Sequence, residues 1–208
     1  MTLVILGTVA AGLYLIKRLD QAIKLSRRHM LVIVLAGFTG NGILCWRLGP
    51  QGSLSRLLLS VILGCLLLAC ITDLAIYQVH NFVWWFSGIA AGLLLFVEIR
   101  RDIGIAGSVL SELLAFCIIQ IVLFGQLYGR ADCYAFCVCA GAEVGLGMGI
   151  VGFLEHMILA FLLLTVVQAF RKNISRKGNL KKPVPFLPYI TTAFYLLLFC
   201  ESCQLFCK

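Results

Sequence analysis

The segment RLLLSVILGCLLLACITD, residues 56–73, decides the class of fold. It is an apolar run of the length that a helix needs to cross the hydrocarbon core of a bilayer, about 17–25 residues. Asp73 stands at its end, just before the short segment 74–81. A carboxylate at the edge of a bilayer is costly and usually has a function. The segment therefore raises two questions: how many such runs the chain holds, and whether a second carboxylate meets Asp73.

The composition of the whole chain agrees with this segment. Of the 208 residues, 62% are hydrophobic and only 12% are charged, and the mean hydropathy is +1.03. Water-soluble domains carry about 25% charged residues. Because lipid offers no hydrogen bonds to a peptide backbone, repeated apolar runs with so little charge predict an all-α, polytopic membrane protein in contact with the lipid bilayer.

Eight apolar runs are candidate transmembrane helices, with six or seven as alternative counts. The run 133–170 is too long for one crossing, and its glycines between 145 and 152 mark the expected turn. Basic residues follow the first run and none precedes it, so it is interpreted as a short span and not as a cleaved signal. Residues 1–208 are expected to form a single membrane-embedded domain. The predicted spans are 2–16, 30–46, 56–73, 82–98, 104–125, 133–148, 150–170 and 186–206.

The net charge of +8 lies mainly in two loops. Residues 17–29 hold five basic side chains and one acidic one, and residues 171–182 hold six basic side chains and no acidic one. The positive-inside rule places both loops in the cytoplasm, together with 74–81 and 126–132, although two arginines at 100–101 would then lie outside. The basic residues lack an aromatic partner pattern, so no nucleic acid is expected to bind.

Asp132 is the second carboxylate. It follows LFGQLYGRA, residues 123–131, and precedes the sixth predicted span. In the predicted topology Asp73 and Asp132 lie at similar depth at the cytoplasmic ends of their spans. Two carboxyl groups brought together in a low dielectric titrate as a unit that holds one proton. The ionised group can then take a proton from water while the protonated one donates to a scissile carbonyl, which is the chemistry of aspartic proteases.

Other polar residues leave a different function open. Four glutamates lie in or near predicted spans and could form the proton pathway of a small proton-coupled transporter. His156 could form a polar pair with its neighbour Glu155. Most of the ten cysteines lie in apolar runs, and the single CESC motif at 200–203 has no second ligand pair, so no metal site is expected. The four glutamates are Glu112, Glu143, Glu155 and Glu201.

Three short motifs resemble those of the type IV prepilin peptidase family, the bacterial branch of the intramembrane GxGD aspartic proteases. Asp73 is followed, at the distance typical of the family, by VHN at 79–81, where the family has Ile-Pro-Asn. GRAD at 129–132 resembles the family's Gly-x-Gly-Asp, and PVPFLPYI at 183–190 contains its Pro-Phe-x-Pro signature. The order and placement of the motifs fit an eight-span core over about residues 30–200.

The resemblance implies an activity and roles for five residues. Asp73 and Asp132 would be the catalytic aspartates, acting without a metal or organic cofactor. Gly129 and Ala131 would shape the turn that holds Asp132, and Asn81 would support the turn after Asp73. The implied function is an endopeptidase that removes the leader of type IV pilin-like precursors at the cytoplasmic face of the bacterial inner membrane.

Departures from the family pattern define the alternatives. His80 replaces a proline, Ala131 replaces a glycine and Tyr134 stands where the family often has lysine. Such changes leave open a catalytically inactive homologue that serves as a membrane assembly subunit. Bifunctional members carry paired CxxC motifs after the first span, whereas residues 17–29 contain no cysteine. The chain therefore resembles the small, peptidase-only members that serve Flp-type pili.

Overall fold

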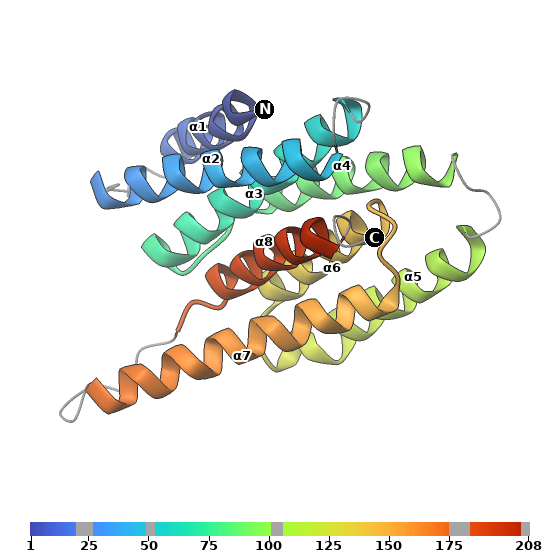
Figure 1. The fold of residues 1–208 in the computed structure, drawn as a ribbon. Coiled ribbons are helices and arrows are strands. Elements are labelled where there is room, and N and C mark those ends of the chain that lie inside the picture. Colours follow the sequence, from blue (N-terminus) through green and yellow to red (C-terminus); the bar gives the residue numbers. More distant parts are fainter. Residues whose placement is uncertain (20–26, 49–52, 101–105, 175–183, 205–208) are drawn as a thin grey trace.

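The computed structural model describes residues 1–19, 27–48, 53–100, 106–174 and 184–204. Within these residues the chain folds into eight α-helices and one short 3-10 helix, without a strand (Figure 1). Each predicted apolar run overlaps one α-helix, and the fifth also reaches η1, so the described residues confirm the all-α prediction. The elements are α1 (Thr2–Leu19), α2 (Arg27–Leu48), α3 (Ser53–Ile76), α4 (Asn81–Ile99), α5 (Ala106–Val122), η1 (Phe124–Gln126), α6 (Arg130–Val144), α7 (Ile150–Ile174) and α8 (Leu187–Gln204).

Three of the described helical stretches are long and apolar enough to cross a membrane. They are Ser53–Ile76, Gly107–Gln126 and Ile150–Phe170, and two shorter apolar stretches cover Asn81–Val97 and Leu187–Cys200. Large apolar side chains also lie on the outer surface, as at Leu3 with 84% and Trp85 with 72% exposure. Because water would penalise such a surface, the fold is compatible with a helical membrane bundle.

The helices form two groups that pack against each other, α1 to α4 and α5 to α8 (Figure 1). Helix α3 is the centre of the bundle, since it packs against α1, α2, α4, α6 and α8. Its side chains are buried almost all round, with Leu59, Leu63 and Leu66 fully inaccessible. A helix that is apolar on every side is expected to be buried in this way.

Helix α8 lies between the two groups and contacts α2, α3, α6 and α7. Four of its fully buried side chains, Leu187, Ile190, Phe194 and Leu198, follow the three- and four-residue spacing that places side chains on one helix face. This face fixes the rotation of α8 about its own axis.

The glycine-rich turn predicted between the sixth and seventh spans is present. Helix α6 ends at Val144 and α7 begins at Ile150. Gly147 has a φ of 78°, in the left-handed region that favours glycine. The Met148 N–H donates to the Glu143 carbonyl over 2.9 Å, which closes the turn. The long apolar run is therefore divided into two antiparallel neighbours, as its length requires.

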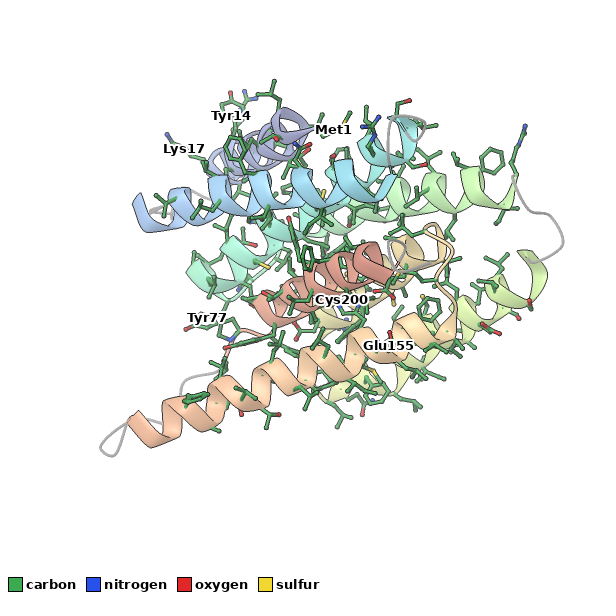
Figure 2. All side chains as sticks on the ribbon, in the orientation of Figure 1. Met1, Tyr14, Lys17, Tyr77, Glu155 and Cys200 are labelled. Atoms are coloured by element: carbon green, nitrogen blue, oxygen red, sulfur yellow. The ribbon has the colours of Figure 1, made fainter. Side chains whose placement is uncertain are left out.

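The labelled side chains in Figure 2 locate one end of the bundle. Lys17, near the end of α1, and Tyr77, just after α3, both lie toward the end at which α8 begins. The predicted loops 17–29 and 74–81 therefore start from the same end of the bundle. Residues 20–26, most of the first loop, lie outside the described residues.

Candidate active site

Asp73 lies in the last turn of α3, where its side chain is half-buried. The helix ends three residues later, at Ile76, because Tyr77 adopts a left-handed conformation with a φ of 54°. The Tyr77 N–H donates to the Asp73 carbonyl over 3.0 Å. This conformation is costly for a residue with a Cβ, and it turns the chain away from α3 one turn beyond the carboxyl group.

The N-terminus of α8 meets the Asp73 side chain. The backbone N–H of Leu187, the first residue of α8, donates a hydrogen bond to the Asp73 carboxyl group. The first N–H groups of a helix have no partner inside the helix and attract anions. The other carboxyl oxygen, Asp73 Oδ2, is buried and has no hydrogen-bond partner among the described residues. One side of the carboxyl group is therefore held by backbone, and the other side is left for a proton, a water molecule or a substrate.

Phe186, in the predicted Pro-Phe-x-Pro signature, anchors the start of α8. Its ring centroid lies 5.8 Å from Tyr128, 5.9 Å from Phe136 and 5.1 Å from Phe161. Tyr128 directly precedes Gly129, so this aromatic cluster joins the entrance of α8 to the entrance of α6. Aromatic pairs at such distances contribute about 0.5–1.5 kcal/mol each beyond burial.

Asp132 lies in the first turn of α6. Gly129 immediately precedes the helix, with a φ of 101° and a ψ of 148°, a conformation that is essentially restricted to glycine. A Cβ at Gly129 would lie 3.4 Å from Asp132 Oδ2. Ala131 is an ordinary helical residue, because the only non-glycine residue with positive φ in the described chain is Tyr77. The alanine in place of the family's second glycine therefore causes no backbone strain.

The two aspartates share one partly buried site. Asp132 precedes the predicted span 133–148, and its pKa is raised to about 7, first by burial and second by the negative charge of Asp73. Both aspartates also act electrostatically on Cys70, which lies one turn before Asp73. The Cys70 thiol donates to Thr191 Oγ1 of α8 over 3.0 Å. The structure thus brings Asp73 and Asp132 together where the end of α3 meets the starts of α6 and α8.

A cavity of about 290 Å³ lies between α2, α3 and α8. Its walls are mostly apolar, and its lining includes Cys70 and Leu74 of α3 and Pro188 and Thr191 of α8. The cavity therefore offers space for an apolar group near the ends of α3 and α8, although neither aspartate lines it.

The predicted supporting residues after Asp73 are described by contacts other than ones to the two aspartates. Asn81 is the exposed first residue of α4, and its role in supporting the turn stays a prediction. The His80 ring stacks on Phe82 at 5.9 Å, and its Nε2 atom is buried without a hydrogen-bond partner among the described residues. Tyr134, where the family often has lysine, packs against Trp84 at 6.1 Å.

The glutamates occupy three different environments. Glu112 is half-buried on α5, and Glu155 is exposed on α7 (Figure 2). Glu143 is fully buried and lies 2.7 Å from Nδ1 of His156. The sequence paired His156 with Glu155, but neighbouring residues on a helix do not face each other. The side chain of Glu201 lies outside the described residues, as do those of Cys203 and Cys207.

No protein-family model, curated protein or solved structure matches the chain. Among the described residues, no group of three or more His, Cys, Asp or Glu side chains could hold a metal ion. Interpretation of the site therefore depends on the geometry of Asp73 and Asp132 and on the helix ends that hold them.

The sequence motifs located both aspartates but not the contact between Leu187 and Asp73. The prolines at 185 and 188 could have indicated it, because proline is favoured in the first turn of a helix. A helix that starts there, in the same region as two carboxyl groups, offers its free N–H groups to them.

Proposed function

We propose that the chain is a membrane-embedded aspartic endopeptidase of the prepilin peptidase type, whose eight predicted spans cross the bacterial inner membrane. Its substrates would be type IV pilin-like precursors, from which it removes the leader at the cytoplasmic face. The observation that carries the proposal is that Asp132 is buried within electrostatic reach of Asp73: burial first, and the negative charge of Asp73 second, raise the pKa of Asp132 to about 7. One carboxyl group of such a pair is protonated and the other ionised near neutral pH.

The environments of the two carboxyl groups support different roles. Burial favours the protonated form of both carboxyl groups, but Asp73 also accepts the Leu187 N–H, which favours its ionised form and makes it the better general base of the two. Asp132 is the better proton donor, because burial and the neighbouring charge favour its protonated form. In this mechanism Asp73 takes a proton from a water molecule while the oxygen of that water attacks the scissile carbonyl carbon, and Asp132 donates its proton to the carbonyl oxygen. The proton held by Asp73 then passes to the amide nitrogen as the C–N bond breaks, and one hydroxyl of the tetrahedral intermediate returns a proton to Asp132 as the new carboxyl group forms.

The place of the site also supports this class of substrate. The pair lies at helix ends, where a peptide bond just before an apolar transmembrane segment could reach it. The cavity between α2, α3 and α8 offers apolar walls to the residues around such a bond. A soluble peptide would gain less from these walls than a segment that already lies in lipid.

Asparagine at either aspartate tests the proposal, because asparagine keeps the shape of the side chain but removes its ability to titrate. Membranes that contain the protein and a type IV pilin-like precursor would be analysed for leader removal by mass spectrometry. Asp73→Asn and Asp132→Asn are each expected to abolish cleavage, while Glu155→Gln, which changes an exposed carboxylate on α7, keeps it. Unchanged processing in either aspartate variant would show that the pair is not catalytic and would favour an assembly role for the chain.

A further inference from the structure

A second polar cluster lies in the core, away from the two aspartates. His156 of α7 is 1% exposed, and its Nδ1 atom lies 2.7 Å from the Glu143 carboxyl group of α6. Its Nε2 atom lies 2.9 Å from the backbone carbonyl oxygen of Ile190 in α8. One imidazole ring therefore joins three helices through two short polar contacts.

The partners determine where the protons are. A carbonyl oxygen can only accept a hydrogen bond, so Nε2 carries a proton and donates it to Ile190. Nδ1 lies 2.7 Å from Oε1 of Glu143, and a hydrogen bond between them requires a proton on one of the two groups. The hydrogen bond to Ile190 of α8 therefore does not depend on Glu143, whereas the contact to α6 needs a hydrogen-bonding partner at position 143.

The helix that His156 holds is the one that touches the first aspartate. Ile190 lies one turn after Leu187, whose N–H donates to Asp73, and directly before Thr191, which accepts a hydrogen bond from Cys70. A shift or rotation of α8 would change both of these contacts.

The other helix in the cluster carries the second aspartate. Helix α6 begins at Arg130, so Asp132 lies in its first turn and Glu143 in its last. Helix α8 packs against both α3 and α6 and so lies between the two aspartate-bearing helices. The position of α8 along its own axis therefore determines how its N-terminus is placed against Asp73.

We propose that His156 is a positioning residue of the peptidase, and that its Nε2–H bond to the Ile190 carbonyl holds the N-terminus of α8 against Asp73. This inference depends on the proposed function, because the effect of positioning is measured as a cleavage rate. His156 does not touch the reacting atoms. Its effect is transmitted by Leu187, while Glu143, or a glutamine in its place, can pair with Nδ1.

Packing of the ring is the alternative explanation and can be separated from the hydrogen bond. The imidazole centroid lies 5.5 Å from Phe136 and 5.7 Å from Phe194, so any replacement of His156 also removes ring contacts. Glutamine places its amide nitrogen near the position of Nε2, whereas asparagine places it near that of Nδ1. In a Glu143→Gln background neither replacement leaves a carboxylate buried opposite an amide.

The test compares three variants in purified, detergent-solubilised protein. E143Q/H156Q keeps the donor to Ile190 and is expected to cleave a pilin-like precursor at nearly the wild-type kcat. E143Q/H156N loses that donor and is expected to lose about 10- to 100-fold in kcat, the loss associated with a misplaced catalytic group, with little change in KM. Phe194→Leu, which loosens the same part of the core, should lower Tm with little change in kcat.

Several results would overturn the inference. One is equal kcat for E143Q/H156Q and E143Q/H156N, and another is a loss in Phe194→Leu as large as that in E143Q/H156N. If E143Q/H156N fails to accumulate, the kcat of the single variant Glu143→Gln provides the test. This substitution leaves the Nε2 bond intact and must keep its kcat, so a large loss in that variant contradicts the proposal. Failure of the proposed function is distinguishable, because the wild-type protein would then show no cleavage that depends on Asp132.

Discussion

Gly129→Ala is the substitution whose effect can be worked out most completely from the structure. Gly129 has a φ of 101° and a ψ of 148°, and its new Cβ would lie 3.4 Å from Asp132 Oδ2. Non-glycine residues in such regions cost about 1–3 kcal/mol each. The first turn of α6 can relieve this strain only by a change of backbone that also moves the Asp132 side chain.

The expected loss follows from that cost. If the strain has to be overcome to reach the active geometry, about 1–3 kcal/mol corresponds to a roughly 5- to 150-fold lower kcat. The assay is the rate of leader removal from a pilin-like precursor by purified protein, with Tm measured in parallel.

Two other glycines provide matched controls for this prediction. Gly147→Ala introduces a Cβ at a φ of 78°, in open space in the turn at the far end of α6. It should lower Tm and leave kcat unchanged. Gly125→Ala, in η1, meets only ordinary contacts at 3.9 and 4.0 Å and should change neither. The reasoning is refuted if Gly129→Ala keeps the wild-type kcat, or if Gly147→Ala loses as much activity.

Three further predictions concern pH, the end of α3 and the start of α8. Since Asp132 acts in its protonated form and has a pKa raised to about 7, kcat should fall as pH rises through about 7; a flat profile from pH 6 to 9 would contradict this role. Tyr77→Gly should raise the free energy of unfolding by about 1 kcal/mol, because it relieves the left-handed conformation of an exposed residue. A lower Tm would count against that reading of the helix end. Phe186→Ala should lower the free energy of unfolding by about 3–5 kcal/mol, because it opens a cavity in the aromatic cluster, and it should also lower kcat. Chemical denaturation measures the first effect and the cleavage assay the second. If neither stability nor kcat falls, the cluster does not anchor α8.

The helices of the fold could be predicted because run length and composition determine them. Each predicted span lies on one helix, and the turn at Gly147 falls where the run became too long for one crossing. The meeting of Asp73 with Asp132 also followed from topology, since both lie at span ends on the same predicted side. Local sequence therefore contained the information for the helices and for the position of the site at the ends of the spans.

The contacts that orient the site could not be predicted in the same way. The bond from the Leu187 N–H to Asp73 joins backbone to a side chain far away in sequence. Similarly, His156 pairs with Glu143 on another helix and not with the adjacent Glu155, a choice set by the rotation of α6 and α7. Rotations of this kind depend on the packing of the whole bundle, because many residues contribute to each helix–helix contact.

The central claim is that Asp73 and Asp132 hold one proton between them near neutral pH. Infrared difference spectroscopy of the protonated carboxyl band, recorded as a function of pH, tests it directly. In the wild-type protein we expect a band that disappears near pH 7. This band should be absent in Asp132→Asn and should disappear at lower pH in Asp73→Asn, because the neighbouring negative charge is lost. A band that titrates at the same pH with and without the Asp73 carboxyl group would contradict the claim.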